Sequence, residues 1–574
     1  MVATPVKTKR LTVQVANLTA DTTAIRSLDW DRDRFDIEFG LQNGTTYNSY
    51  LIRGEKIALV DTSHEKFRQL YFDSLNGLIN PQEIDYLIIS HTEPDHSGLV
   101  KDLLQLAPNI TVVGSKVAIQ FLENLVHHPF QRQLVKNGDQ LDLGNGHILE
   151  FVNAPNLHWP DTIFTYDHGS GILFTCDAFG MHYCSDDLYD EQLSAIEPDY
   201  RFYYECLMAP NARSVLAAMK RMEPLGNINL VANGHGPVLK HNVTELLTRY
   251  RDWSQAQTKA EKTVAVFYIS DYGYSDRLCQ SIAKGITKTG LAVETLDLKS
   301  ADPQEVKELA SSAVGIVIGT PPVSGIHAQE ITGNLGTILA SVNPKQYLGM
   351  FESKGDDDES ILPLFNKFRE VGLTKAFDPI RSAETPNESL YQRCEEAGTD
   401  LGQLLTQEVK VKQRKSLDTD LDKAIGRISG GLYIITTKKG DRSGAMVASW
   451  VTQASFDPPG FTVAVAKDRA IESLMQVGDQ FILNILEEGN YQTLMKHFLK
   501  RFGPGEDRFA GVNTRTANNG SPILADALAY LECEVVSRME CADHWIVYNK
   551  VTDGRVSKPD GLTAVHHRKV GNYY

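Results

Sequence analysis

The stretch His91-Thr92-Glu93-Pro94-Asp95-His96 directly follows the apolar run Tyr86-Leu87-Ile88-Ile89-Ser90. It places several metal-ligating side chains on one turn just beyond a predicted buried strand. Imidazoles mixed with carboxylates suit redox-active iron, whereas tighter nitrogen and sulfur sets more often hold zinc. The alternative interpretation is a polar loop at a strand end that happens to contain two histidines.

Three later loops carry further side chains of the same kind. They contain His158 within residues 156–161, Asp177 after the apolar residues 171–176, and His235 within residues 233–237. Each loop follows a predicted strand, and loops at strand ends are where a rigid sheet positions a functional site. A lone histidine in one such loop would more often be structural. Four loops with the same arrangement predict one metal site.

Together these residues resemble the metallo-β-lactamase fold in the variant found in flavodiiron proteins, whose motif is H-x-E-x-D-H followed by isolated His, Asp and His. The resemblance implies that one iron is held by His91, Glu93 and His158, the other by Asp95 and His235, with Asp177 bridging the two. His96 matches the last position of the motif, which is a ligand in some members only, so its role stays open. No motif ligand is replaced in this chain, which implies a working diiron centre.

Size and charge set further limits. A chain of 574 residues is too long for one core and predicts about three domains. A net charge of -16 without a basic cluster argues against nucleic acid as a partner. Residues 1–18 have no apolar signal core, and no segment is long and apolar enough to span a bilayer. We therefore expect a soluble cytoplasmic protein without a membrane partner.

The seven cysteines are scattered, and none forms a C-x-x-C pair. This distribution is typical of a reducing compartment. It also argues against a built-in rubredoxin or iron–sulfur module, which would need clustered cysteines.

The hydrophobic pattern predicts three domains, at residues 1–258, 259–407 and 421–574. The first alternates short β-rich runs with turns and a few helices, including 212–221 with Asn211 as its N-cap and 243–253. The second opens with the continuous apolar run 263–269 and then alternates helices and strands, as in a doubly wound α/β fold. The polar residues 254–259 and the charged residues 408–415 are interpreted as linkers.

Two loops of the second domain resemble the flavodoxin pattern for binding FMN. The first joins a strand to a helix N-terminus, where backbone N–H groups and the helix dipole attract phosphate. The second follows the third strand, near the point where the strand order of such sheets reverses. The predicted FMN contacts are Ser270, Asp271, Tyr272, Gly273, Tyr274 and Ser275 in the first loop, and Thr320, Pro321, Pro322, Val323 and Ser324 in the second. The acidic residues 351–359 depart from the family's third loop and would weaken FMN or change its potential; the alternative is a turn facing solvent.

The third domain resembles the flavin-reductase-like split β-barrel, through a small-Ala-Ser segment and a Ser-x-Asp-Pro-Pro turn near residues 447–459. The resemblance implies a second flavin, FMN or FAD, that takes hydride from NAD(P)H. The predicted flavin contacts are Ser449, Trp450, Thr452, Ala454 and Ser455. No Gly-x-Gly-x-x-Gly motif is present, and split barrels bind nicotinamide without it.

The expected fold class is thus α/β multidomain: a metallo-β-lactamase-like αββα domain, a flavodoxin-like domain and a flavin reductase-like split β-barrel. The three modules predict electron flow from NAD(P)H through two flavins and a diiron pair to O2, which is reduced to water. The resemblance, to the three-domain diflavin proteins of oxygenic phototrophs, also implies a homodimer or a heterodimer with a related chain. Ferredoxin stays open as the donor. The alternatives are a nitric oxide reductase of the same architecture, a metallohydrolase with regulatory flavin domains, and an accessory subunit with a broken relay.

Overall fold

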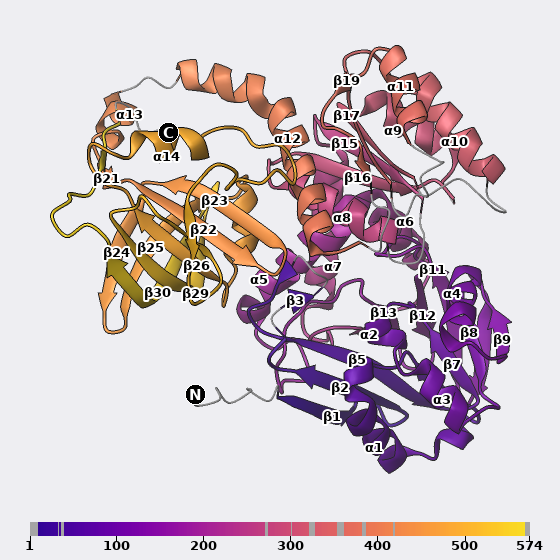
Figure 1. Ribbon diagram of the computed structural model, residues 1–574. Helices are drawn as coiled ribbons and strands as arrows, with labels where there is room; N and C mark the ends of the chain where they lie inside the picture. Colours follow the sequence, from indigo (N-terminus) through magenta and orange to yellow (C-terminus); the bar gives the residue numbers. More distant parts are fainter. Residues whose placement is uncertain are drawn as a thin grey trace. The chain divides into compact units, whose positions relative to one another are not determined.

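Strand β7 (Tyr86–Ile89), which leads into the H-x-E-x-D-H motif, lies inside a seven-stranded sheet (Figure 1). The computed structural model describes residues 10–32, 34–35, 39–269, 274–299, 301–320, 328–352, 361–381, 386–416 and 420–568. The chain forms two compact units. The N-terminal unit contains the described residues up to Phe35 and from Leu41 to Glu261, and the C-terminal unit contains residues 39–40 and the described residues from Lys262 onwards. No helix in these ranges combines the length and apolar character that crossing a bilayer requires.

The N-terminal unit contains two sheets. The first has the order β1 (Leu11–Asn17), β2 (Thr22–Asp29), β5 (Thr45–Arg53), β6 (Ile57–Val60), β7, β8 (Thr111–Gly114) and β9 (Gln131–Leu134). The second has the order β10 (Gln140–Gly144), β11 (His147–Asn153), β12 (Ile163–Asp167), β13 (Ile172–Cys176) and β14 (Leu230–Asn233). The very short strand β3 (Arg34–Phe35) also belongs to this unit, whereas the equally short β4 (Phe39–Gly40) belongs to the C-terminal unit.

Helices connect many of the strands of this unit. They are α1 (Arg68–Leu78), α2 (Pro94–Ser97), α3 (Val100–Leu106), α4 (Lys116–Val126), α5 (Leu193–Tyr203), α6 (Ala212–Met222) and α7 (Val243–Thr258), with short helical turns η1 (Glu65–Phe67), η2 (Pro81–Glu83), η3 (Tyr204–Met208) and η4 (Ala209–Asn211).

The alternation of side chains along β7 explains why its whole sequence is apolar. Leu87 and Ile89 belong to the core shared with α1, α3 and α4, whereas Ile88 belongs to the core between the two sheets. Successive side chains of a strand point to opposite faces. A strand covered on both faces therefore needs apolar residues at every position, and this rigid strand carries the motif.

The C-terminal unit begins with a parallel sheet of the order β16 (Ala292–Asp297), β15 (Thr263–Tyr268), β17 (Gly315–Thr320), β18 (Tyr347–Glu352) and β19 (Thr374–Lys375), with β20 (Ile380–Arg381) also paired to β18. In sequence order this is 2-1-3-4-5, the flavodoxin-like arrangement. Its helices are α8 (Tyr274–Thr287), α9 (Pro303–Ser312), α10 (Ala328–Ser341), α11 (Leu362–Glu370) and α12 (Glu388–Ser416). Separate apolar cores lie on the two faces of the sheet. We refer to residues 262–416 as the flavodoxin-like part.

The rest of the C-terminal unit, residues 420–568, is built on an antiparallel sheet, and we call it the barrel part. Its order is β23 (Arg442–Ala448), β22 (Tyr433–Lys439), β26 (Gln480–Ile485), β29 (Ala529–Cys541), β30 (His544–Val556), β25 (Pro459–Ala466) and β24 (Val451–Phe456). The smaller elements are α13 (Asp420–Ile425), η5 (Ala470–Leu474), α14 (Gln492–Phe498), and the strand pairs β21 (Gly430–Gly431) with β31 (Val565–His566) and β27 (Thr514–Thr516) with β28 (Pro522–Leu524).

Three local predictions were wrong. Residues 254–258 continue helix α7, which was expected to end at residue 253, and the charged residues 408–415 continue helix α12, so neither segment interpreted as a linker lacks regular structure. Both consist mainly of good helix formers, and this propensity outweighs their polar character. Asn211 makes no capping hydrogen bond, because its side chain donates to the Leu207 carbonyl instead.

Candidate metal centre

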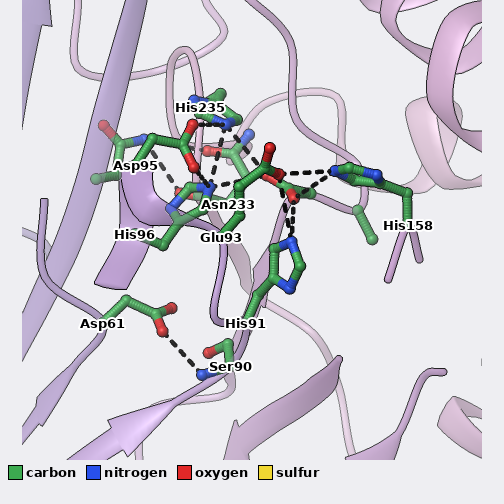
Figure 2. A network of polar contacts seen from close by, with 12 residues as sticks. Asp61, Ser90, His91, Glu93, Asp95, His96, His158, Asn233 and His235 are labelled. Carbon is green, nitrogen blue, oxygen red and sulfur yellow. Dashed lines mark hydrogen bonds and ion pairs between the residues drawn. The ribbon is translucent and has the colours of Figure 1, made fainter. Parts of the chain in front are cut away.

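Four loops of the N-terminal unit bring seven ligand-type side chains to one place. Figure 2 labels all of them except Asp177. The first loop follows β7, the second joins β11 to β12, the third follows β13 and the fourth follows β14. The side chains form two groups within which the possible ligand atoms lie within 4.8 Å of one another: His91, Glu93, His158 and Asp177, and Asp95, His96 and His235.

The first group surrounds one oxygen of Asp177. Nε2 of His91 lies 3.4 Å from Oδ2 of Asp177, and Nε2 of His158 lies 3.3 Å from the same oxygen. Glu93 completes the group, with Oε2 at 3.4 Å from His91 and 3.0 Å from His158. Two imidazoles and two carboxylates therefore face a common point.

The second group surrounds the other oxygen of the same carboxylate. Oδ1 of Asp177 lies 3.0 Å from Nε2 of His96 and 3.1 Å from Nε2 of His235. Asp95 approaches the two histidines at 3.5 and 3.4 Å. The two oxygens of Asp177 thus face different groups, which is the arrangement a bridging ligand needs. His96, whose role the sequence leaves open, lies inside the second group.

The backbone around the centre is adapted to this crowding. A Cβ atom on Gly234 would lie 2.7 Å from Cε1 of His96, so only glycine allows the imidazole its position. Asn156 and Cys176, which lie just before His158 and Asp177, adopt left-handed φ angles of 64° and 52°. Such conformations are uncommon for non-glycine residues and concentrate at functional sites.

Burial and charge act against each other on the ionisation of these groups. Burial alone would lower the pKa of His158 and His96, but the carboxylates of Asp177, Glu93 and Asp95 outweigh it and raise these pKa values to about 10 and about 9. Burial would raise the pKa of Asp177, but His96, His158 and His235 hold it well below its ordinary value. Asp177 is thus ionised, and a cation entering the site would displace protons from His158 and His96.

Outer partners orient the imidazoles, and sequence reasoning missed them. Asp161 accepts from Nδ1 of His91 at 3.0 Å and is itself held by the backbone and hydroxyl of Thr92. Nδ1 of His235 lies 2.6 Å from the carbonyl oxygen of Thr46. The sequence could have indicated Asp161, because it is a carboxylate three residues after His158. It could not have indicated the Thr46 carbonyl, because every residue has a backbone carbonyl.

Further polar groups lie beside His235. The ring of His182 is 4.5 Å from that of His235, and the ring of Tyr203 is 4.9 Å from that of His182. Among the described residues, His182 Nε2 and the Tyr203 hydroxyl have no hydrogen-bond partner. The neighbouring Tyr204 is different, because its hydroxyl forms a hydrogen bond of 2.9 Å with the hydroxyl of Ser254.

The chemistry of the side chains fits a pair of metal ions. Among the described residues, His91 Nε2 and Asp177 Oδ2 are buried without a hydrogen bond, although they lie 3.4 Å apart. Nε2 of His96 and Nε2 of His235 lie 3.2 Å apart and face the same oxygen. Lone pairs converging in a buried space are stabilised by cations, and this mixture of imidazole and carboxylate suits iron.

The predicted FMN loops are described only in part. Ser270, Asp271, Tyr272, Gly273, Pro321, Pro322, Val323 and Ser324 lie outside the described residues, as does the acidic run 353–359. Tyr274 begins helix α8, and Ser275 and Thr320 are buried. The last two lie at the start of α8 and the end of β17, on the carboxyl side of the sheet, where ligands of such folds bind.

A cavity of about 280 Å³ lies in the C-terminal unit, and it takes in two of the predicted flavin contacts, Ser449 and Trp450. The other three predicted contacts are not part of its lining. Thr452 and Ala454 are exposed on the edge strand β24, and Ser455 bonds to the Tyr548 hydroxyl.

Comparison with known proteins shows to which class of protein this chain belongs. Residues 45–236 match the model of the ODP family beta lactamase, and residues 425–573 match that of the flavin reductase like domain. A metal-soaked flavodiiron core from Synechocystis sp. PCC 6803 is similar in structure, with a TM-score of 0.64 and 38% sequence identity over 69% of this chain and 99% of that one. The predicted fold class is confirmed, and the class is that of the flavodiiron oxidoreductases.

One curated relative narrows this class to a family. Diflavin flavoprotein A 1 of Synechocystis sp. is 71% identical to this chain over 99% of its length and 98% of the relative. The chain belongs to the diflavin flavoprotein A family of flavodiiron proteins, as the motif predicts.

Proposed function

We propose that this chain reduces O2 to water with electrons from NAD(P)H. The observation that carries the proposal is the position of Asp177, whose two oxygens face two separate groups of ligands. His91, Glu93 and His158 would hold one iron, Asp95, His96 and His235 the other, and Asp177 both. When bound, the irons and flavins supply the redox chemistry: flavins accept hydride and pass on single electrons, and two irons deliver electrons to O2.

The protein's own residues shape the reaction site. His91, His96, His158, Asp177 and His235 are at most 6% exposed, so their side of the site is shielded from bulk water. The carboxylates of Glu93 and Asp95 are partly exposed, at 14% and 21%. Tyr203 keeps its proton, because burial and the charge of Asp177 raise the pKa of its hydroxyl well above the ordinary value. It is therefore a proton-bearing group beside His235, on the side of the second set of ligands.

The electron entry would lie in the C-terminal unit. We assign the FMN site to the carboxyl edge of the parallel sheet, and the second flavin to the cavity beside Ser449. The two separate sheets of this unit, each with its own apolar core, support treating it as two domains. A cytoplasmic location and a homo- or heterodimer remain part of the proposal, as does ferredoxin as an alternative donor.

An anaerobic reduction followed by a pulse of O2 tests the function. The iron and flavin contents of the purified protein are first quantified. The protein is then reduced with NADPH or NADH without O2, and after the pulse the O2 consumed and the peroxide formed are measured. We expect two equivalents of NAD(P)H oxidised per O2 and no peroxide, since four electrons convert O2 to water. Stoichiometric peroxide, or turnover without iron, would contradict the proposal. If the same reduced protein is given a pulse of nitric oxide instead and consumes it faster than O2, the related nitric oxide reductase is favoured.

Changing Asp161 to asparagine is expected to weaken metal binding at His91. The asparagine keeps the size of the side chain but removes the charge that orients and polarises the imidazole. Loss of such an outer partner typically costs about 10–100-fold in metal affinity or activity. Metal content per chain after dialysis against a chelator measures the effect, and unchanged retention in Asp161→Asn would contradict the role assigned to Asp161.

A further inference from the structure

The part of helix α12 that spans residues 391–401 is buried on both of its sides. Tyr391, Cys394 and Leu401 belong to an apolar core of the flavodoxin-like part, where α12 packs beside α8 (Figure 1). The polar residues Glu395 and Glu396 on the helix are also buried. The polar side of an amphipathic helix normally faces water. A second protein surface must therefore cover it.

That surface is the barrel part. Glu396 accepts a hydrogen bond from Nη2 of Arg508 at 2.8 Å and another from the backbone N–H of Gly505 at 2.9 Å. The Arg508 side chain is buried, and Gly505 adopts a left-handed φ of 74°, which favours glycine. Glu396 of the flavodoxin-like part thus contacts two residues, Gly505 and Arg508, of the segment 501–508 of the barrel part.

The same segment and the same helix form walls of the 280 Å³ cavity. From α12 come Glu396, Thr399, Asp400 and Gln403, and from the barrel part come, among others, Trp450, Phe498, Lys500, Arg501, Phe502 and Arg508. The cavity therefore offers aromatic rings next to cationic side chains. Ser449 adds a hydroxyl that is buried at 6% exposure and has no hydrogen-bond partner among the described residues.

These groups suit an aromatic ligand that carries phosphate. Rings contact a flat heterocycle, arginine and lysine bind phosphate, and a buried hydroxyl without a partner is stabilised by a polar ligand atom. Flavin mononucleotide has this chemistry. In the proposed function the cavity holds the second flavin, and the inference below rests on that assignment.

We propose that α12 is part of the C-terminal flavin site, and that Glu396 is a positioning residue for it. Glu396 touches the segment 501–508 and orders Arg501, Phe502 and Arg508 along the cavity wall. The flavin of the barrel part then binds only when the flavodoxin-like part is docked. This makes the two flavin-binding parts one coupled module.

The direction of the change in flavin affinity distinguishes a positioning role of Glu396 from a purely electrostatic one. Glu396 is an anion close to a site for an anionic ligand, so removing its charge should tighten binding if only electrostatics mattered. If Glu396 positions the cationic segment, the same change should weaken binding. Glu396→Gln in the full-length protein is the test, because it keeps the size of the side chain and removes the charge.

We expect Glu396→Gln to bind FMN at the C-terminal site about tenfold more weakly, the equivalent of one lost charge-assisted hydrogen bond. Flavin content per chain and FMN titration of the deflavinated protein, followed by flavin fluorescence, measure this. The flavodoxin-like site should keep its FMN. Equal or tighter binding of both flavins in Glu396→Gln would overturn the proposal.

Glu388→Gln is the matched control. Glu388 lies on the same helix and pairs with Arg442 of the barrel part at 3.1 Å, but its side chain is 45% exposed and does not line the cavity. This variant should keep both flavins. If both variants lost the C-terminal flavin equally, Glu396 would only help to dock the two parts, and its positioning role would be overturned.

A second variant covers the case in which Glu396→Gln does not fold. Arg508→Lys keeps the charge and loses the planar two-armed geometry of the guanidinium. It should weaken the same flavin several-fold and leave the other in place, and unchanged binding in this variant would overturn the proposal. Flavin binding is measured without O2, so peroxide formation by the wild type would refute the proposed reaction alone. A wild type that binds no flavin in the cavity would overturn this inference.

Discussion

Replacing Asp177 by alanine is expected to remove metal from both positions of the centre. One carboxylate oxygen faces His91 and His158 at 3.4 and 3.3 Å, and the other faces His96 and His235 at 3.0 and 3.1 Å. Loss of this side chain takes a ligand from each ion and also removes the charge that keeps them close together. The affinity for both irons should fall by more than the roughly 10–100-fold that an outer partner costs. Iron per chain after anaerobic reconstitution and desalting measures the result.

Single-position variants make this result specific. His91→Ala and His235→Ala should each empty mainly one position and leave the other partly filled, because each imidazole belongs to only one group. Asp73, exposed on α1, provides a carboxylate control whose removal should leave the iron content unchanged. If Asp177→Ala retained one iron as well as His91→Ala does, the bridging role would be wrong.

The centre could be predicted because its signal is local in the sequence. Four ligand-type residues lie within six positions, and the strand before them is apolar throughout since both of its faces are buried. His158, Asp177 and His235 each follow a strand. The length of the strands and the turn after each one are encoded close by, so the convergence of the loops follows from a sandwich of two sheets.

Other contacts depend on tertiary structure and leave no local signal. The carbonyl oxygen of Thr46 orients His235 from a distant strand, and its residue type says nothing about this role. The side chain of His96 could have pointed away from the centre, and only the folded structure shows it beside Gly234 and 3.0 Å from Oδ1 of Asp177. Thr452 and Ala454 are in a strand with the expected pattern, but that strand is at the sheet edge, and their side chains are exposed.

The extent of α12 illustrates a different difficulty. The charged run 408–415 has the composition of a solvated linker and also that of a helix, because glutamate, lysine, glutamine and arginine all favour helices. What selects the helix is its earlier half, which is held between α8 and the barrel part. Gly398 allows close approach to α8 and Gly402 to Thr289 just after it, since a Cβ at these positions would lie 2.1 Å from the Ile282 carbonyl oxygen and 2.2 Å from the Thr289 hydroxyl.

Replacing Lys288 by methionine is expected to destabilise the C-terminal unit strongly. Lys288 is buried at the end of α8 and forms ion pairs with Glu395 of α12 and, at 2.7 Å, with Glu472 of the barrel part. Glu395 keeps Lys284 and Glu472 keeps Arg538, but both buried carboxylates lose one cation, which costs up to about 3–5 kcal/mol. The midpoint of urea unfolding, followed by flavin release and circular dichroism, measures the loss.

An exposed lysine provides the control that tests whether the loss of stability in Lys288→Met comes from burial. Lys375 pairs with Asp378 at 2.7 Å, but both side chains are largely exposed. Lys375→Met should change the free energy of unfolding by less than about 1 kcal/mol. A loss of similar size in both variants would mean that the buried cluster adds nothing beyond an ordinary surface pair.

Acid should affect the wild type more than Lys288→Met. Burial alone would raise the pKa of Glu472, but Lys288 and Arg538 outweigh it and hold the pKa below its ordinary value of 4.5. A carboxylate with a lowered pKa stabilises the fold above its unfolded pKa, and this contribution is lost as the pH falls from about 4.5 towards the folded value. Without Lys288 the pKa of Glu472 moves back up, so less stability remains to be lost in acid. Unfolding midpoints at pH 7 and pH 4 should therefore differ less in Lys288→Met, and an equal or larger shift would contradict the role of the cluster.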